Sequence, residues 1–269
     1  MIRFLFTILL FFTLHSLSAQ QQISFCSWNI ANFGKSKHDT TIAYIAEVLR
    51  NFDVVAIQEV VAGPGGAQAV ARLHDALNRK GAKWDYVISD PTTGSNGQER
   101  YAFLWKTSVL KRTGSAFLEK YYKNEIEREP YFITFSAGNK QFTLVSFHAV
   151  PKSKQPEREI SYFKCLPDMY PGHTLIFAGD FNCPQWHNVF NPLKSSGYVP
   201  ALKGQKTTLR QQCLHGDCLA SEFDNIFYPA EKIIPHRSGI VPFYQRYATV
   251  QDARRLSDHV PIFLQFSIK

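Results

Sequence analysis

The chain has 269 residues, of which 45% are hydrophobic and 19% are charged, and this composition excludes a disordered, collagen-like or coiled-coil protein. Its 30 basic and 22 acidic side chains give a formal charge of +8, so a polyanion is a candidate partner. Charge alone does not distinguish nucleic acid, anionic lipid and simple solubility.

The first 19 residues have the pattern of a secretory signal peptide. Arg3 supplies a positive start and residues 4–14 form a short apolar run, whereas a membrane-spanning helix needs about 20 apolar residues. The run is followed by small residues of the kind that signal peptidase accepts, Ser16, Ser18 and Ala19. We therefore predict a secreted or periplasmic protein of residues 20–269 that has no membrane anchor after cleavage.

Short apolar segments from Ile23 onward predict β-strands. In chain order these strands cover residues 23–30, 53–60, 84–89, 101–106, 131–137, 141–150, 173–181, 222–228 and 261–268. Helical spacing of apolar residues predicts helices over 39–50, 67–80 and about 155–166. No linker-like stretch divides these segments, so we expect one domain over 20–269. The element content favours two β-sheets packed face to face with helices outside.

Five cysteines are too few for a disulfide scaffold, so the hydrophobic core must stabilise the fold. Cys213 and Cys218 are the favoured pair because a bond between them closes a small loop, and two free thiols are the alternative. A zinc site is not expected, because no C-x-x-C or H-x-x-x-H spacing occurs.

Polar side chains gather at the ends of six predicted strands or just beyond them. These residues are Asn29, Glu59, Glu99, His148, Asp180 with Asn182, and Asp258 with His259. The C-terminal ends of strands in an α/β sheet form the crevice where ligands bind. Buried strand ends do not usually collect carboxylates unless these are paired or bind a metal. A single His or Glu there would more often be structural, but six such segments predict a catalytic site.

Seven motifs occur in order over most of the chain: NIANFG, QEV, QERYAFLWK, REP, SFHAVP, GDFN and LSDHVP. They resemble those of the endonuclease/exonuclease/phosphatase superfamily, and ERYAFLW, REP and GDFN are most similar to DNase I-like nucleases of the secreted, bacterial type. The resemblance implies an α/β fold, a four-layer αββα sandwich of two packed mixed β-sheets flanked by helices. It also implies metal-dependent phosphodiester hydrolysis at one edge of the two sheets.

This chemistry needs an activated water, a proton for the leaving oxygen and positive charge beside the phosphate oxygens. A hard cation such as Mg²⁺ needs oxygen ligands, which Glu59 with Asn29 or Asp258 can supply. Mn²⁺ could replace Mg²⁺, and the family resemblance suggests Ca²⁺ as a structural or auxiliary ion.

The resemblance further implies that each catalytic histidine is paired with an acid that orients it. Glu99 would orient His148 as the general acid and Asp224 would orient His259 as the general base, although the two roles could be exchanged. Asp224 lies within a predicted strand, where a carboxylate could merely bond to the backbone. Asp180 and Asn182 complete the catalytic set and, together with Asn29, would hold the scissile phosphate and the metal.

Two further residues are expected to contact the substrate phosphate besides Asn182. Arg128 of the REP motif can donate two parallel hydrogen bonds to phosphate oxygens. The alternative is that it is a solvated charge beside Glu127 and Glu129. Thr207 matches a phosphate-contacting position of the family, in a loop that aligns less clearly.

The chain departs from the pancreatic-type nucleases at Val61 and Gly97, where those enzymes carry an Arg and a Tyr that enter the DNA minor groove. Minor-groove insertion is therefore unsupported, although phosphate contacts alone can supply most non-specific affinity. Nearby cationic replacements are Arg72, Arg79 and Arg100.

We expect a secreted, divalent-metal-dependent endonuclease that cleaves DNA with little sequence preference and acts as a monomer without a protein partner. Within the same fold the alternatives are an RNA or single-strand nuclease and a sphingomyelinase-like phospholipid phosphodiesterase, for which a hydrophobic membrane-contact hairpin would be diagnostic. A non-catalytic binding module is the least favoured, because every catalytic position is filled.

Overall fold

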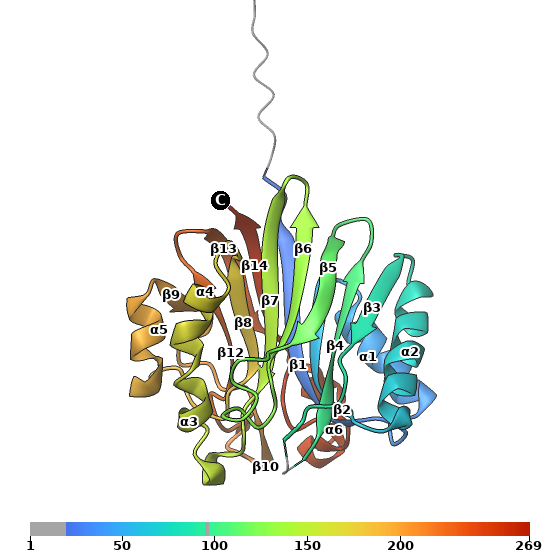
Figure 1. Cartoon of the computed structure of the whole chain (residues 1–269). Helices are drawn as coiled ribbons and strands as arrows, with labels where there is room; N and C mark the ends of the chain where they lie inside the picture. Colours follow the sequence, from blue (N-terminus) through green and yellow to red (C-terminus); the bar gives the residue numbers. More distant parts are fainter. Residues whose placement is uncertain (1–19, 95–96) are drawn as a thin grey trace, which may run out of the picture.

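In a computed structural model, which describes residues 20–94 and 97–269, two six-stranded mixed β-sheets pack against each other (Figure 1). Across the first sheet the strands are β13 (Ile233–Ile240), β14 (Ile262–Ile268), β1 (Ile23–Phe33), β2 (Val54–Val61), β4 (Glu99–Lys106) and β3 (Trp84–Ile88). Across the second they are β5 (Lys111–Leu118), β6 (Tyr131–Ala137), β7 (Lys140–His148), β8 (Leu175–Asp180), β12 (Asp224–Pro229) and β9 (Tyr198–Pro200). A separate hairpin consists of β10 (Leu209–Leu214) and β11 (Asp217–Leu219).

Helices cover the outer faces of both sheets, on either side of the sandwich in Figure 1. The first sheet carries α1 (Asp39–Leu49), α2 (Pro64–Asn78) and α6 (Val250–Leu256), with the 3₁₀ turn η4 (Phe243–Arg246). The second carries α3 (Glu157–Ile160), α4 (Leu166–Met169) and α5 (Asn191–Ser195), with the 3₁₀ turns η2 (Phe163–Cys165) and η3 (Asn188–Phe190). A further 3₁₀ turn, η1 (Lys152–Lys154), has no buried residue. The predicted αββα sandwich is therefore confirmed.

The central strands of both sheets are apolar on both faces because they are buried on both sides. In β1, Phe25 packs between the two sheets, whereas its neighbours Cys26 and Trp28 pack under the helices. In β8, Ile176 points to the layer between the sheets and Phe177 to the opposite helix layer. Three stacked hydrophobic layers thus hold the four structural layers together.

Each predicted strand has a counterpart in the structure, and the helices predicted over 39–50 and 67–80 correspond to α1 and α2. The helix predicted over 155–166 is wrong as a continuous element, because the segment divides into α3, η2 and α4. The α-helical hydrogen-bond pattern is interrupted because the N–H groups of Tyr162 and Cys165 donate to the carbonyls three residues earlier, those of Glu159 and Tyr162.

The parallel pairing of β7 with β8 determines where the polar strand ends lie. Its register places His148 opposite Asp180, and the antiparallel pairing of β8 with β12 places Asp224 opposite the same Asp180. In the other sheet, β1 and β2 run parallel with Asn29 opposite Gln58. The predicted site residues on these strands therefore meet at one edge of the sandwich, the lower edge in Figure 1.

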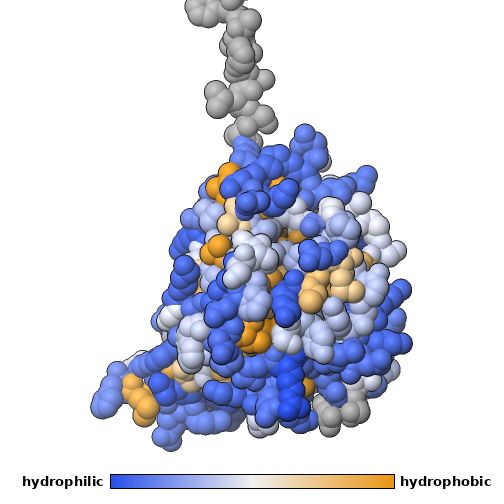
Figure 2. Space-filling model, turned by 60° about the vertical axis from the view of Figure 1, so that its left-hand side comes forward, coloured by the Kyte–Doolittle hydropathy of each residue, from blue (hydrophilic) through white to orange (hydrophobic). Residues whose placement is uncertain are grey.

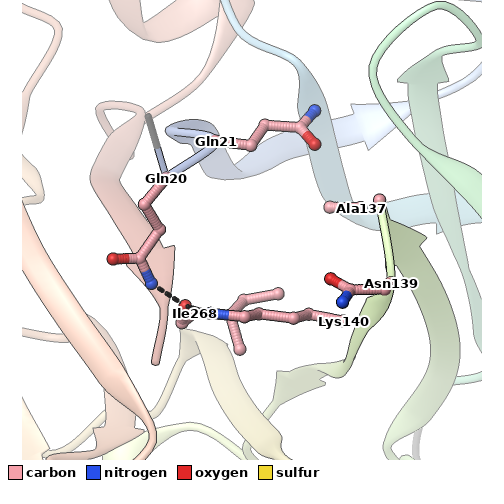
Figure 3. A pocket seen from close by; sticks show the side chains of 7 residues that line it. Gln20, Gln21, Ala137, Asn139, Lys140 and Ile268 are labelled. Carbon is pink, nitrogen blue, oxygen red and sulfur yellow. Dashed lines mark hydrogen bonds between the residues drawn. The ribbon is translucent and has the colours of Figure 1, made fainter. Parts of the chain in front are cut away.

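A cavity of about 580 Å³ lies at the opposite edge, between the first described residues and the β6–β7 turn (Figure 3). The side chains of Gln20 and Lys140 both donate hydrogen bonds to the carbonyl oxygen of Ile268 there. Lys140 is the one charged residue among those that line it. This cavity therefore brings no catalytic set together.

None of the described helices is long and apolar enough to cross a membrane. The predicted signal peptide, residues 1–19, lies outside the described residues.

Candidate active site

Two buried histidines face one carboxylate at the lower edge of the sandwich. The Nε2 atoms of His148 and His259 each lie 3.5 Å from Oδ2 of Asp180. On the other side of each ring, Nδ1 of His148 lies 2.9 Å from Oε2 of Glu99, and Nδ1 of His259 lies 2.8 Å from Oδ2 of Asp224. Because a carboxylate fixes each Nδ1, both Nε2 atoms are free to exchange protons with a substrate.

The charges of this cluster shift the pKa of both histidines upward. Burial alone lowers the pKa of His259, but the carboxylates of Asp224 and Asp180 outweigh burial and raise it to about 10. Burial also lowers the pKa of His148, and Glu99 reverses this effect although the positive charge of Arg128 opposes it. The neighbouring carboxylates therefore favour the protonated form of both imidazoles.

The acids respond to the same contacts. Burial raises the pKa of Asp180, but the two histidines facing it lower the pKa below its usual range. Burial likewise raises the pKa of Glu99, and its partner His148 brings it below the ordinary value. For Asp224, burial and the nearby charge of Asp180 raise the pKa despite the bond to His259. Asp180 is thus the stable anion at the centre of the cluster.

The GDFN motif holds Asp180 and Asn182 in position through its backbone. The N–H of Asn182 donates to Oδ1 of Asp180 at 2.8 Å, and the Asn182 side chain donates to the carbonyl of Ala149 at 3.0 Å. Asn182 has φ of +48°, a left-handed conformation that asparagine adopts more readily than most residues. At Gly179 a Cβ would lie 1.9 Å from the carbonyl oxygen of Phe147, so only glycine permits this approach of β8 to β7.

The predicted metal ligands provide oxygen atoms, as a hard cation requires. The side-chain oxygen of Asn29 is buried and has no hydrogen-bond partner among the described residues, while its NH₂ donates to Asp180 at 3.2 Å. Glu59 adopts φ of +58°, and its carboxylate accepts from the backbone N–H of Asn32 at 2.9 Å. The side chain of Asp258 is 41% exposed, and its Oδ2 lies 3.4 Å from Nη2 of Arg254. The unsatisfied buried acceptor of Asn29, next to the carboxylate of Asp180, fits a divalent cation. His259, Asp180 and Asp224 also offer ligand atoms within 4.8 Å of one another.

Thr207, which is predicted to contact the substrate phosphate, is bonded to an acid of the site. It is fully buried. Its hydroxyl donates to Oδ2 of Asp224 at 2.6 Å and accepts from the backbone N–H of the same residue at 3.0 Å. The side chain therefore positions the carboxylate that orients His259.

Arg128 lies inside the site and is largely enclosed, with 11% of its side chain exposed. Its Nη1 lies 3.2 Å from Oε2 of Glu99, and its Nη2 donates to the carbonyl oxygen of Ala149. Its Nε is buried without a partner among the described residues. Arg128 thus holds the acid of the His148 pair, and its predicted phosphate contact would have to be made by the N–H groups that these two bonds leave unused.

Two of the expected cationic replacements for the minor-groove contacts are already bound to the protein. Arg100 donates to the carbonyl oxygens of Ala62 at 2.8 Å and Ser89 at 2.7 Å, and Arg72 forms an ion pair with Asp39 at 3.1 Å. Arg79 follows α2 near the start of β3, at the edge remote from Glu99. Val61 is 38% exposed, so its position remains open to a substrate.

Two buried residues that support the site, Tyr101 and Lys37, are not among the predicted site residues. The hydroxyl of Tyr101 accepts from the N–H of His148 at 3.2 Å and donates to the carbonyl oxygen of Arg128 at 3.3 Å. Its spacing of two from Glu99 on one strand, which places both on the same face, was the available signal. Lys37 donates to the carbonyls of Arg255 and Leu256 at 3.1 and 2.6 Å, at the end of α6. Lysine is normally exposed, so nothing in the sequence marked it.

The sequence profile of the Endonuclease/Exonuclease/phosphatase family matches residues 26–259 of the chain. The chain belongs to this family. It is 30% identical over 284 residues to a protein named deoxyribonuclease from Thioalkalivibrio sp. (strain K90mix), with 97% of this chain and 75% of that protein covered. It is 24% identical to deoxyribonuclease gamma of Homo sapiens, with 95% of this chain and 88% of the relative covered. The chain is accordingly a hydrolase that acts on phosphodiester bonds.

Solved structures share the fold at low sequence identity. A family member from Bacteroides thetaiotaomicron superposes with a TM-score of 0.66 at 14% identity, covering 93% of this chain and 99% of that one. The catalytic domain of human Nocturnin gives a TM-score of 0.65 at 17% identity, with 93% of this chain and 97% of that domain covered. A D. rerio TDP2 complexed with a single-strand DNA product gives a TM-score of 0.64 at 15% identity, with 91% of this chain and 99% of that chain covered. These likenesses agree with the two-sheet architecture.

Proposed function

We propose that the chain is a secreted DNase I-like nuclease that hydrolyses DNA with little sequence preference, using a divalent metal ion and two histidines. The observation that carries this proposal is the convergence of His148 and His259 on Asp180, each with Nε2 at 3.5 Å. Two oriented proton carriers on either side of one anionic group match a reaction that removes a proton from water and delivers another to a leaving oxygen.

We assign the two proton transfers by the charges around each ring. His259 is held by Asp224. A cation at the neighbouring Asp258 would favour the neutral ring, whose Nε2 would take the proton of the attacking water as the P–O bond to that water forms. The pKa of His148 is also raised, but the positive charge of Arg128 opposes this rise, so His148 is the better proton donor of the two rings. Its Nε2 would therefore protonate the oxygen that leaves when the second P–O bond breaks. Asp180 lies beside both rings and stabilises whichever one is protonated.

The metal-ion part of the proposal depends on Asn29, Glu59 and Asp258, which would hold the cation through oxygen atoms. Mg²⁺ is the best match to such a donor set, and Mn²⁺ is the closest substitute. When bound, the ion would neutralise negative charge on the phosphate oxygens.

DNA is the proposed substrate because relatives that align over most of the chain are named deoxyribonucleases. The basic excess of the chain favours a polyanion. The face of the molecule in Figure 2 is largely hydrophilic, and its hydrophobic residues lie in small separate areas rather than in one patch. A lipid-binding surface would instead require a contiguous apolar area.

Secretion is proposed from the N-terminal sequence, in which apolar residues 4–14 precede Ser16, Ser18 and Ala19. The disulfide between Cys213 and Cys218, the favoured pairing, is present and suits an oxidising compartment. N-terminal sequencing of protein from the culture medium should begin at residue 20, and retention of residues 1–19 would contradict cleavage.

The activity test uses purified residues 20–269 with plasmid DNA, RNA or sphingomyelin vesicles, each in Mg²⁺, Ca²⁺ or EDTA. We expect plasmid cleavage in Mg²⁺ and none in EDTA, with His148→Ala as the inactive control. Survival of DNA in every metal condition together with cleavage of sphingomyelin would overturn the proposed substrate, and preferential cleavage of RNA would reassign it.

A further inference from the structure

The β10–β11 hairpin stands beside the catalytic centre as a small sheet of its own. Its first strand is joined to the segment that carries the catalytic base, because Thr208 forms an isolated β-bridge with His259 and the N–H of Leu209 donates to the carbonyl of Asp258 at 2.7 Å. Arg254 of α6 donates to the carbonyl oxygen of Leu209. The start of β10 is therefore fixed relative to His259.

The far part of the hairpin is closed by the disulfide between Cys213 and Cys218. Leu214, next to this bond, is 56% exposed and is one of four exposed large hydrophobic residues in the described part of the chain. A cross-linked hairpin loses less conformational freedom when it binds a ligand than a free loop does. An exposed apolar residue on such a support is suited to making contact with a partner.

A groove of about 560 Å³ connects the hairpin with the catalytic residues. Its walls include Asn182, Arg210, Leu214, Phe223, Arg254 and His259. A polymer cleaved at the two histidines must continue past the broken bond on both sides. This groove adjoins His259 and therefore offers a path for one of those sides.

Arg210 supplies a positive charge in this groove that the protein only partly compensates. Its Nη2 lies 3.6 Å from Oδ2 of Asp217, and Lys206 already approaches that same oxygen to 2.7 Å. Its Nε is buried and has no hydrogen-bond partner among the described residues. A guanidinium with an unused donor beside the reaction centre is suited to an oxygen anion such as a backbone phosphate.

We propose that the β10–β11 hairpin is a DNA-binding element that holds the strand next to the scissile phosphate. Arg210 binds a neighbouring backbone phosphate, and Leu214 lies against the sugars of the same strand. This inference rests on the proposed nuclease function and adds a substrate contact in place of the minor-groove residues that the chain lacks at Val61 and Gly97. Because both contacts are to the backbone, they would carry affinity rather than sequence preference.

The test compares Arg210→Gln with Lys111→Gln, a matched loss of charge on an exposed residue of β5 where that strand pairs with Ser136, away from the site. KM is measured for a DNA duplex and for bis(4-nitrophenyl) phosphate, a small diester without flanking nucleotides. For Arg210→Gln the ratio of duplex KM to small-diester KM should rise about 5- to 10-fold at low salt, and the slope of log KM against log salt should fall by about 1. Lys111→Gln should change neither quantity.

A second variant, Leu214→Ser, should raise the duplex KM about 3-fold without changing the salt slope, because it removes an uncharged contact. Equal KM ratios and salt slopes for Arg210→Gln and Lys111→Gln would overturn the assignment of the hairpin while leaving the nuclease function intact. Cleavage of the small diester without cleavage of DNA by the unmodified protein would instead refute the proposed function, and the hairpin assignment with it.

Discussion

The side-chain amide of Asn29 donates a hydrogen bond to Oδ2 of Asp180 at 3.2 Å, although the two residues lie 151 positions apart and in different sheets. This contact joins the end of β1 to the end of β8. It also leaves the amide oxygen of Asn29 buried and without a partner among the described residues. One side chain thereby links the two sheets at the site and offers a free acceptor to a cation.

Replacing Asn29 by Ala should therefore weaken metal binding. Excess Mg²⁺ should raise the melting temperature of the unmodified protein, because a ligand that binds the folded state stabilises it. The rise should be clearly smaller in Asn29→Ala, whereas Asn139→Ala at the opposite edge should behave like the parent protein. Differential scanning fluorimetry with and without EDTA measures this effect. An unchanged Mg²⁺ response in Asn29→Ala would remove the residue from the ligand set.

Replacing either histidine should abolish most of the turnover without unfolding the protein. His148→Ala and His259→Ala each remove one proton carrier, and the loss in kcat should be at least about 100-fold. Single-turnover rates on plasmid DNA give the effect, and circular dichroism checks the fold. Near-normal rates in either variant would refute the acid–base assignment.

Thr207→Val distinguishes a role in positioning Asp224 from a direct contact with the substrate phosphate. Loss of the 2.6 Å bond to Asp224 should lower kcat roughly 10-fold, because a single hydrogen bond to a charged group contributes about 1.5–3 kcal/mol. It should also move the pH profile of kcat while leaving KM for DNA nearly unchanged. Thr113→Val on exposed β5 is the matched control. A rise in KM at constant kcat would instead favour the phosphate contact.

The raised pKa of His259 predicts a pH-dependent contribution to stability. A pKa raised to about 10 in the folded state means that protonation of His259 stabilises the fold fully below its unfolded pKa of about 6.5. This contribution is lost as pH rises from that value towards 10. In EDTA, the difference in free energy of unfolding between the parent and His259→Gln should be largest near pH 6 and decline by pH 10. Urea titrations measure it, and a difference that stays constant across this range would contradict the linkage.

Val61→Arg should increase affinity for duplex DNA. Val61 is 38% exposed at the end of β2, beyond Glu59, so an arginine there can reach a phosphate or groove edge. Fluorescence anisotropy at low salt should show binding about 3- to 10-fold tighter, together with a steeper salt dependence. Asn139→Arg adds the same charge at the far edge and should have a weaker effect. Equal changes in the two variants would mean that net charge rather than position determines the affinity.

The sequence by itself predicted the elements that form most of the two sheets. Buried strands such as β1 and β8 are apolar on both faces, a local pattern that remains visible without partners. The short edge strand β9 and the strongly exposed β5 and β13 were not predicted, because their residues lack a continuous apolar run. Edge strands form by pairing with a neighbour, and a single sequence does not contain that information.

The sequence also determined which residue types could perform the chemistry, since His148, His259 and their acids stand at strand ends in motif order. Only the tertiary structure decided how each one is used. Thr207 turned inward to Asp224, Arg100 bound two carbonyls and Lys37 capped α6, because the partner of a polar side chain comes from residues distant in the chain. Local pattern therefore identifies a catalytic set, whereas the packing of the two sheets assigns its contacts.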